Sequence, residues 1–454
     1  MAADAAKIVL MIVCARIEAA WSIALAMALS SIAPLSAIAA AKELPTDLWP
    51  MYQYASDHNA AFNLPRWNVA WHATLGGRIN GGLSIVGRML YVESYDRRLY
   101  ALDPLTGKEL WRATLSNIAM NTPVVAAGLV YAGTGSSHVM SDSEAGNLWG
   151  SPGGDSVYAF RNDSGAFAWR YETIGEDMPT GTIVAAGARP AFVFSNGDGN
   201  ARALSAGTGE LLWQQKMLGV STMSSLAVDG STVFGLSNAA STFVMNAYTA
   251  HQSVHLARRA WTWALNSGNG QFIWTSPYGN SDCSPALGEG NVLIEGTQFG
   301  PPGLFVTEVD ALDAHTGVLR WKYSSGPGPA ESTGTNELAT AGLYDGGLFF
   351  DSLQFVDQFA AFDASTGRVV WRIHTQGPVK MSAVEKDGYL YFGDVRGYLY
   401  VVHARDGKML ALTKFPEFFA AAPPVIVGGT LFVVNNATVY ALRLADLQRG
   451  LIST

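Results

Sequence analysis

The sequence predicts an all-β fold: an eight-bladed β-propeller of four-stranded antiparallel blades, closed by an N-terminal outer strand in the last blade. Two observations carry this prediction. A phrase that ends in Gly-x-x-x-Trp recurs at intervals of roughly 40 to 60 residues, with short alternating segments between the copies. The two ends of the chain also hold complementary parts of one further copy, which predicts that the ring closes between them.

Each copy of the phrase describes a turn between two strands. In LYALDPLTGKELW at 99–111, a strand ends at Asp103, Gly107 lies in the turn, and the next strand presents Trp111. Glycine tolerates the left-handed backbone of such a turn, and a buried indole removes about 150–250 Å² from water. We therefore interpret the tryptophans as structural contacts between blades. The glycines are Gly107, Gly165, Gly209, Gly270, Gly317, Gly367 and Gly407. The tryptophans are Trp71, Trp111, Trp169, Trp213, Trp274, Trp321 and Trp371.

The two ends of the chain complete the count of blades. The last copy, at 399–411, has Ala411 in place of tryptophan, and the segment WNVAWHATL at 67–75 matches ELWRATL at 109–115. We expect 67–75 to form the outer strand of the last blade, beside residues 423–442, which makes eight blades. Ala411→Trp is expected to raise thermal stability if the position has room for an indole, whereas a loss would mean that another side chain fills it.

Innermost strands are predicted where small residues precede each phrase. Crowding near the axis of a propeller accounts for their size. These segments are 81–87, 122–128, 180–187, 224–230, 284–290, 338–346, 382–388 and 423–429.

Composition excludes several classes of protein. The chain has 454 residues, is 49% hydrophobic and 15% charged, and carries 37 acidic against 29 basic side chains, for a net charge of −8. This balance argues against nucleic-acid binding, which needs a basic face. Two cysteines exclude a disulfide scaffold and a thiolate zinc cluster.

The N-terminal region is predicted to direct export. An apolar run at 19–32 is followed by small residues at 37–41, the layout of a secretory signal peptide. An uncleaved membrane anchor is the alternative. The predicted organisation is a signal peptide or anchor at 1–41, a lead-in at 42–65, the propeller at 66–446 and a C-terminal tail at 447–454. The predicted location is periplasmic or otherwise exported.

These phrases resemble the tryptophan-docking repeats of pyrroloquinoline quinone (PQQ) dehydrogenases, the quinoprotein alcohol dehydrogenase-like family, over about 65–446. The segment 132–180 is similar to the blade of that family that ligates calcium and carries the catalytic base. The resemblance implies PQQ and calcium as cofactors. However, Ser136 stands where the family has a calcium-ligating Asn, and Met178-Pro179 stand where it has a Trp-Asp pair whose Asp is the base. The family's adjacent cysteine pair is absent. Asp177 is a weak candidate to replace the base.

The repeats are also similar to those of the propeller subunit of the outer-membrane β-barrel assembly machinery. That subunit binds protein partners and performs no chemistry. This second resemblance is confined to the repeats and implies a protein partner in the cell envelope.

Candidate ligand-binding residues lie in the loops that lead into the innermost strands, because loops on a rigid scaffold commonly form ligand sites. The sulfur-bearing members are interpreted as an apolar plug in the channel, with a Cu(I) site as the alternative. No other metal site is predicted; His251 and His255, in the insertion 237–260, are interpreted as exposed on a surface helix. The candidates at the channel mouth are Arg78, Asn80, Met120, Met178, Met223, Asp282, Cys283, Asn336, Glu337, Lys380 and Met381.

The sequence favours an exported binding or scaffold protein without dehydrogenase chemistry of its own. Its expected partner is an envelope protein or a small-molecule ligand. The alternative is a PQQ-dependent alcohol or sugar dehydrogenase with altered calcium and base residues. The ligand, the partner, the oligomeric state and the role of 237–260 stay open at this point.

Overall fold

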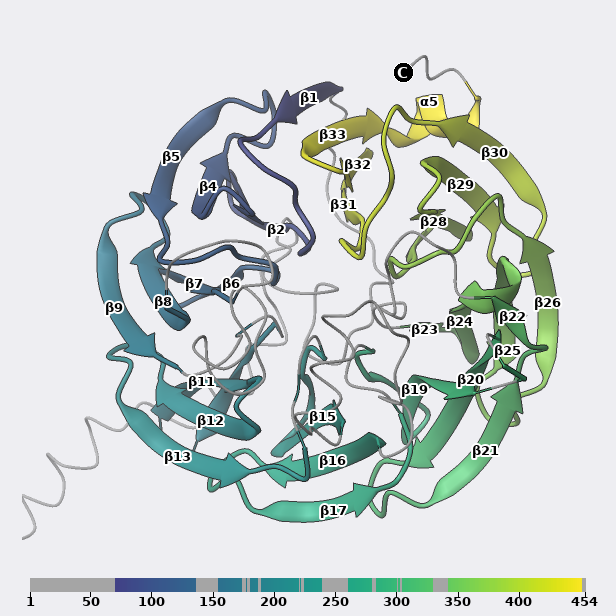
Figure 1. The fold of residues 1–454 in the computed structure, drawn as a ribbon. Helices are drawn as coiled ribbons and strands as arrows, with labels where there is room; N and C mark the ends of the chain where they lie inside the picture. Colours follow the sequence, from purple (N-terminus) through teal and green to yellow (C-terminus); the bar gives the residue numbers. More distant parts are fainter. Residues whose placement is uncertain are drawn as a thin grey trace, which may run out of the picture. The chain divides into compact units, whose positions relative to one another are not determined.

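The computed structural model describes residues 70–135, 154–173, 177, 180–186, 189–219, 221, 224–238, 260–279, 283–299, 301–302, 304–329 and 342–450. These residues form eight antiparallel sheets arranged in a ring, with a short strand of each sheet toward the centre (Figure 1). The predicted fold class is confirmed. No helix among the described residues is long and apolar enough to cross a membrane.

The first four blades follow one another along the chain, each running from its inner to its outer strand. Blade 1 consists of β2 (Ser84–Val86), β3 (Met89–Ser94), β4 (Arg98–Leu102) and β5 (Glu109–Thr114). Blade 2 consists of β6 (Val124–Ala126), β7 (Leu129–Gly133), β8 (Ser156–Arg161) and β9 (Phe167–Glu172). Blade 3 consists of β10 (Thr182–Ala186), β11 (Arg189–Ser195), β12 (Asn200–Ser205) and β13 (Leu211–Lys216). Blade 4 consists of β14 (Ala227–Asp229), β15 (Thr232–Asn238), β16 (Ala260–Asn266) and β17 (Phe272–Ser276).

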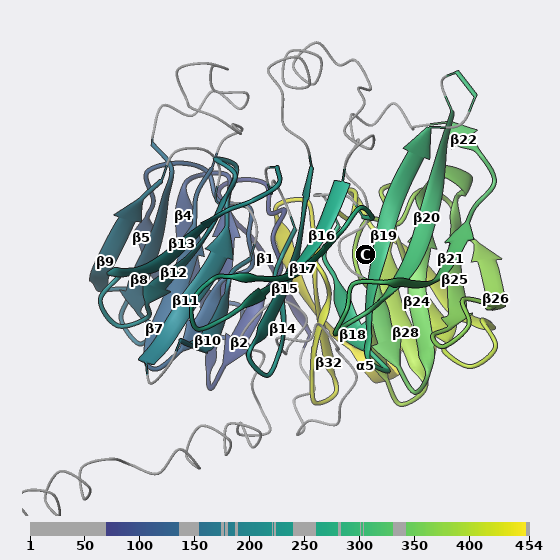
Figure 2. The same cartoon turned by 90° about the horizontal axis from the view of Figure 1, so that it is seen from below.

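The remaining blades follow the same plan, and the hairpin of blade 5 extends beyond its neighbours (Figure 2). Blade 5 consists of β18 (Ala286–Gly288), β19 (Asn291–Phe299), β20 (Leu304–Asp313) and β21 (Leu319–Ser324), and the short β22 (Gly328–Pro329) pairs with β20. Blade 6 consists of β23 (Leu343–Asp345), β24 (Leu348–Leu353), β25 (Gln358–Asp363) and β26 (Val369–His374), with the 3₁₀ turn η3 (Gln354–Val356) between β24 and β25. Blade 7 consists of β27 (Val384–Lys386), β28 (Tyr389–Gly393), β29 (Tyr398–His403) and β30 (Met409–Lys414). Blade 8 consists of β31 (Val425–Val427), β32 (Thr430–Asn435), β33 (Thr438–Arg443) and β1 (Trp71–Thr74).

Blade 8 joins the two ends of the described chain. β1 pairs antiparallel with β33, with Trp71 opposite Ala441 and Thr74 opposite Thr438. The hydroxyls of Thr74 and Thr438 are 2.9 Å apart. The prediction that an N-terminal segment supplies the outer strand of the last blade is therefore confirmed, and this pairing leaves no gap in the ring.

In each of seven blades, one tryptophan indole contacts the next blade. Each Nε1 donates to a backbone carbonyl in the following turn, at distances from 2.8 to 3.3 Å. The turn glycine lies against the indole: Gly317 has φ +69°, and an added Cβ would stand 2.4 Å from Cε3 of Trp274. Only glycine satisfies both the backbone angle and this close approach. The accepting residues are Pro104, Asn162, Ala206, Ser267, Ala314, Ala364 and Ala404.

A second set of contacts links the inner ends of the first five blades. The amide of Gly82 donates to the Thr122 hydroxyl at 2.9 Å, and the Thr122 amide donates to the Thr180 hydroxyl at 2.9 Å. The series continues from Thr180 to Ser225 at 3.2 Å and from Ser225 to Ser284 at 2.9 Å. Each of these residues stands two positions before its inner strand. Besides being small, these threonine and serine residues accept hydrogen bonds through their hydroxyls from backbone amides of the preceding blade.

The junction between blades 7 and 8, where Ala411 replaces tryptophan, is completed by the short helix α5 (Leu444–Gln448). This helix contacts β30, and its Leu444 and Leu447 are buried in the same core against which Ala411 packs. Gln448 Nε2 donates to the Tyr391 hydroxyl at 2.8 Å, whereas the equivalent Tyr91 hydroxyl of blade 1 donates to a turn carbonyl of the next blade. Residues of α5 therefore fill the space that an indole and a turn fill elsewhere.

Ala411→Trp is therefore expected to lower the free energy of unfolding by about 1–3 kcal/mol, because the larger side chain must displace α5. Urea denaturation of the two proteins measures this difference. Leu412→Trp is the matched control, since Leu412 is exposed on the same strand, and its effect should stay within about 0.5 kcal/mol. A higher midpoint for Ala411→Trp would show that the junction has room for an indole.

Candidate functional site

The loops that lead into the inner strands carry the candidate residues, and we call these segments the axial loops. Asn80, Met120 and Lys380 each lie four positions before an inner strand, namely β2, β6 and β27, so they occupy equivalent places in three blades. All three side chains are buried. Five further candidates lie outside the described residues: Met178, Met223, Asp282, Asn336 and Glu337.

Arg78 is held at the junction of blades 8 and 1 by two aromatic rings. Its guanidinium carbon lies 4.9 Å from the ring centre of Phe418 and 5.6 Å from that of Tyr95. One terminal nitrogen donates to Asn80 Oδ1 at 3.2 Å, while Nε has no hydrogen-bond partner among the described residues. Stacked guanidinium groups with unused donors are suited to bind oxyanions.

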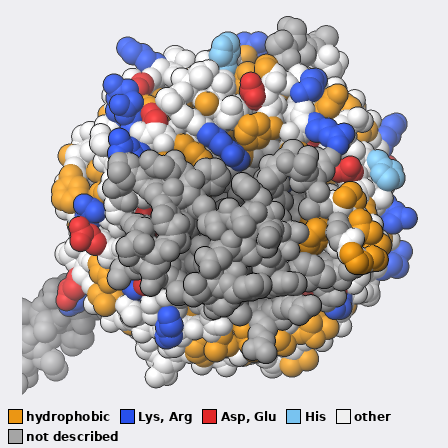
Figure 3. Space-filling model, viewed as in Figure 1, with side chains coloured by type: hydrophobic (Ala, Val, Ile, Leu, Met, Phe, Trp, Pro, Cys, Tyr) orange, Lys and Arg blue, Asp and Glu red, His pale blue; other side chains and the backbone are white. Residues whose placement is uncertain are grey.

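Lys380 places a second cationic group in the axial loop of blade 7. Its side chain is 4% exposed. Blades 7 and 1 flank blade 8, so the axial loops of Lys380 and Arg78 are separated by a single blade. On the face of the ring seen in Figure 3, Lys, Arg, Asp and Glu side chains are scattered over the rim.

The three described sulfur atoms of the axial loops, those of Cys283, Met381 and Met120, accept hydrogen bonds within the protein. Cys283 Sγ accepts from the amide of Glu295 at 3.3 Å, and Met381 Sδ accepts from the amide of Gly393 at 3.0 Å. Asn121 and Ser224 accept the equivalent amides of blades 2 and 4 through oxygen. The position three residues before the inner strand therefore requires a hydrogen-bond acceptor, which Cys, Met, Asn and Ser all provide.

Met120 differs from Cys283 and Met381. It lies one position earlier relative to its inner strand, and its Sδ accepts from the Tyr95 hydroxyl at 3.2 Å. These three sulfurs therefore do not occupy equivalent positions around the axis, and each has a donor from the protein.

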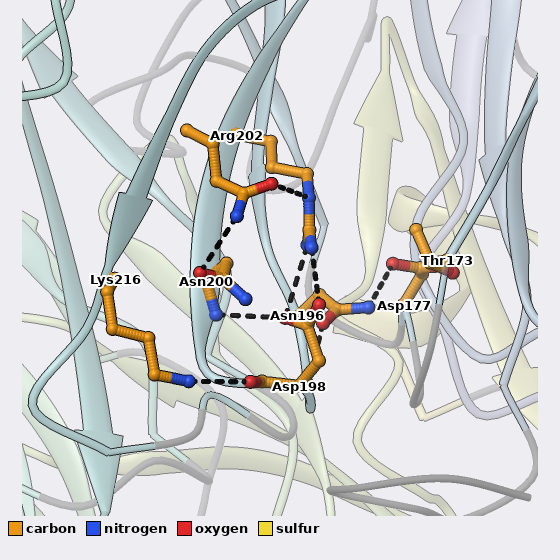
Figure 4. Close-up of polar contacts among 8 residues, drawn as sticks. Thr173, Asp177, Asn196, Asp198, Asn200, Arg202 and Lys216 are labelled. Carbon is orange, nitrogen blue, oxygen red and sulfur yellow. Dashed lines mark hydrogen bonds and ion pairs between the residues drawn. The ribbon is translucent and has the colours of Figure 1, made fainter.

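Asp177 is the centre of a polar network between blades 2 and 3 (Figure 4). One carboxylate oxygen accepts from the Thr173 hydroxyl and the other from Asn196 Nδ2 at 2.9 Å. Asn196 in turn accepts the amide of Asp198 at 2.6 Å, and Asp198 pairs with Arg202. Burial raises the pKa of the Asp177 carboxyl well above its usual value, and the two hydrogen bonds lower it only in part. Both oxygens are thus engaged in holding two blades together.

The described residues do not fit the calcium and PQQ that the resemblance implies. They include no group of three or more His, Cys, Asp or Glu side chains that could hold a metal ion. The one described candidate for a base, Asp177, has both oxygens committed to Thr173 and Asn196. Ser136, Met178 and Pro179, where the sequence departs from the dehydrogenase pattern, lie outside the described residues, as do His251 and His255.

Three buried carboxyls lie on the second strands of their blades, and two of them, Glu295 and Asp351, were missed by sequence reasoning. Glu93 and Glu295 occupy equivalent positions on β3 and β19, and Asp351 lies on β24 of the blade next to Glu295. Neither oxygen of Glu295 has a hydrogen-bond partner among the described residues, and the Glu93 carboxyl lies beside the backbone of Asn121 and Gly133. Burial raises the pKa of each of these carboxyls, in the case of Asp351 to about 7. The available signal was an acidic residue inside an apolar strand; at the position of Glu295, blades other than blade 1 have Gly, Ser, Leu or Val.

Comparison with known proteins places this geometry in a family. A family model described as outer membrane protein assembly factor BamB matches residues 60–276, 153–354, 306–384 and 357–449. The chain belongs to this PQQ-repeat family. The match spans the propeller from its first strand to α5 and confirms the resemblance that the repeats indicated.

Individual relatives of this BamB-type propeller carry two different names. A tetrathionate hydrolase from Acidithiobacillus ferrooxidans is 28% identical over 403 residues, which cover 81% of this chain and 73% of the relative. A second tetrathionate hydrolase, from Acidianus ambivalens, is 25% identical over 82% of this chain and 72% of its own length. BamB from Yersinia pestis is 22% identical over 80% of this chain and 71% of its own length.

Among solved structures, a quinohemoprotein alcohol dehydrogenase from Pseudomonas putida HK5 superimposes on the BamB-type propeller with a TM-score of 0.64. The two share 13% identity, and the match covers 93% of this chain and 83% of the dehydrogenase. At this identity the likeness shows a common fold.

Proposed function

We propose that the chain is an exported propeller that binds and hydrolyses tetrathionate or a related dianion with sulfonate groups at both ends of a short sulfur chain. The observation that carries the proposal is the 28% and 25% identity to two tetrathionate hydrolases, each over about four-fifths of the chain. BamB from Yersinia pestis, matched over a similar length, is 22% identical. The predicted signal peptide at 1–41 and the outer-membrane description of the family support export.

Two cationic groups in axial loops that are one blade apart suit such a substrate. Sulfonate oxygens accept charge-assisted hydrogen bonds, which are stronger than neutral ones. The Arg78 guanidinium is fixed in orientation by Tyr95 and Phe418 and has Nε available as a donor. Lys380 supplies a cation that is removed from bulk water, where electrostatic attraction is less screened. We assign Arg78 and Lys380 to holding the two sulfonate ends.

The reaction needs water but no external oxidant or reductant. The oxygen of water bonds to a terminal sulfonate sulfur, and the bond from that sulfur to its sulfane neighbour breaks. The electron pair of the broken bond remains with the sulfane sulfur, which takes up one proton. One tetrathionate and one water thus give one hydrogen sulfate and one protonated disulfane monosulfonate. The binding residues would fix the ion so that one sulfur–sulfur bond is held for attack.

Purified protein is expected to consume tetrathionate, with release of sulfate measured by ion chromatography. Arg78→Gln should raise KM by about tenfold or more, since a lost charge-assisted contact removes roughly 1.5–3 kcal/mol of binding. Arg88→Gln is the matched control, because Arg88 is an exposed arginine of the same blade and should leave KM unchanged. Wild-type protein that leaves tetrathionate intact would refute the proposal.

The second candidate is the binding or scaffold protein that the sequence favours, with an envelope protein as its partner. The match to the BamB family and the structural role of Asp177 support it. Under this candidate, neither tetrathionate nor alcohol with added PQQ and calcium is turned over. Dye reduction above the control without quinone would instead favour the dehydrogenase alternative.

A further inference from the structure

Glu295 and Asp351 face each other across the junction of blades 5 and 6. Side chains alternate along a strand, so Glu295 lies on the same face of β19 as Leu293, and Asp351 on the same face of β24 as Phe349. Leu293 and Phe349 belong to one hydrophobic core between these two blades. The two carboxyls therefore stand at the edge of a shared apolar interface.

Both carboxyls are buried, and each has at least one oxygen that no described residue pairs. Glu295 is 1% exposed and Asp351 is 3% exposed. Neither oxygen of Glu295 has a hydrogen-bond partner, nor has Oδ2 of Asp351, among the described residues. Asp351 Oδ1 accepts the amide of Ser352 at 2.8 Å. Buried polar groups without partners are rare in native proteins and indicate a function or a missing proton.

The surrounding strands bring no cation to this pair. On β20, Glu308 and Asp310 stand opposite Gly296 and Ile294, so they lie on the other face of the sheet from Glu295. Lys322, on β21, pairs with Glu308 on that other face at 2.8 Å.

The remaining neighbours are neutral or lie at the far end of the junction. Gln354 of η3 is an uncharged amide, and the Cys283 thiol accepts the Glu295 amide. Tyr344 of β23, next to Asp345, donates to Glu289 at 2.9 Å at the opposite end of the blades. The one charge that acts on the Glu295 carboxyl among the described groups is that of Asp351.

We propose that the junction of blades 5 and 6 is a pH-sensitive latch, closed while Glu295 and Asp351 hold protons and opened when they lose them. Two carboxylates cannot both be charged in an apolar interface without a cation, because desolvation and mutual repulsion oppose it. Opening would expose Cys283, since the hydrogen bond from the Glu295 amide to its Sγ holds this residue against β19.

The direction of the pH dependence follows from the raised pKa values. Burial raises the pKa of Asp351 to about 7, and burial together with the charge of Asp351 raises the pKa of Glu295 well above its usual value. Each carboxyl thus binds its proton more tightly in the folded protein than in the unfolded chain. This contribution to stability is complete below the unfolded pKa of about 4 and is lost as pH rises through about 7.

The Cys283 thiol reports on the latch, because it is fully buried in the structure. The experiment uses the full chain with Cys14→Ser, so that Cys283 is the one remaining cysteine. Its rate of labelling by a thiol reagent, divided by that of glutathione at the same pH, should be low at about pH 5 and rise by up to about tenfold per pH unit above about pH 7. The double variant Glu295→Gln/Asp351→Asn should show no such rise.

Glu289→Gln is the matched control, since Glu289 bridges the same two blades from the surface. It should behave as the wild type. The proposal is overturned if the wild type shows no rise or if the double variant shows the same rise. Should the double variant fail to fold, infrared difference spectra of the wild type between about pH 5 and 8 decide, because no loss of a protonated carboxyl signal would refute the proposal.

Discussion

Trp321→Ala is expected to lower the free energy of unfolding by about 3–5 kcal/mol. The indole is 9% exposed, and an added Cβ at Gly367, a residue of the following turn with φ +70°, would stand 2.4 Å from Cε3 of Trp321. Its Nε1 donates to the Ala364 carbonyl at 2.8 Å, so alanine leaves both a cavity and a buried acceptor without its donor. The wild type and the variant are compared by urea denaturation.

Two further variants separate the parts of this effect. Trp321→Phe retains much of the apolar contact but loses the hydrogen bond, so an intermediate loss is expected. Val370→Ala changes an exposed apolar residue on an outer strand and should alter stability by less than about 0.5 kcal/mol. A loss below about 1 kcal/mol for Trp321→Ala would mean that the indole contacts contribute little to the ring.

Asp177→Ala is expected to lower the free energy of unfolding by about 2–4 kcal/mol, because two buried donors lose their acceptor at once. The Thr173 hydroxyl and the Asn196 amide both point at the carboxylate (Figure 4). The same change removes the hydrogen bond that holds the Asn196 side chain. Because Asn196 accepts the amide of Asp198, the ion pair of Asp198 with Arg202 should also be weakened. Thermal and urea denaturation measure the loss.

Asp163→Ala is the control for this prediction, since Asp163 is exposed in the turn between β8 and β9 and should change stability by less than about 0.5 kcal/mol. A catalytic Asp177 would give the opposite pattern. Stability would then be retained while PQQ-dependent dye reduction, if the wild type has any, would disappear.

The repeat could be predicted from sequence because its features depend on residue type at fixed spacing. A turn glycine such as Gly317, with φ +69°, cannot be replaced by most residues without strain, and the large indole of Trp321 follows it at a constant distance. The match of 67–75 to 109–115 also indicated how the ring closes, because the last blade needed an outer strand, which β1 supplies.

Candidate positions at the axis were predictable in the same way. Asn80, Met120 and Lys380 could be named because their spacing to the inner strands repeats from blade to blade. The cation–π contacts of Arg78 could not, since Tyr95 and Phe418 lie in different blades and far apart in the chain.

The repeats in the sequence were enough to predict the architecture: eight blades, their turns, and the strand that joins the two ends. The folded molecule was needed to see that α5 fills the junction at Ala411, that Asp177 joins two blades, and that Glu295 meets Asp351 with no cation from the described strands around them. Turn and strand patterns are local properties of residue type. Burial, pKa and hydrogen-bond partners arise between neighbouring blades, where the side chains that meet are distant in sequence.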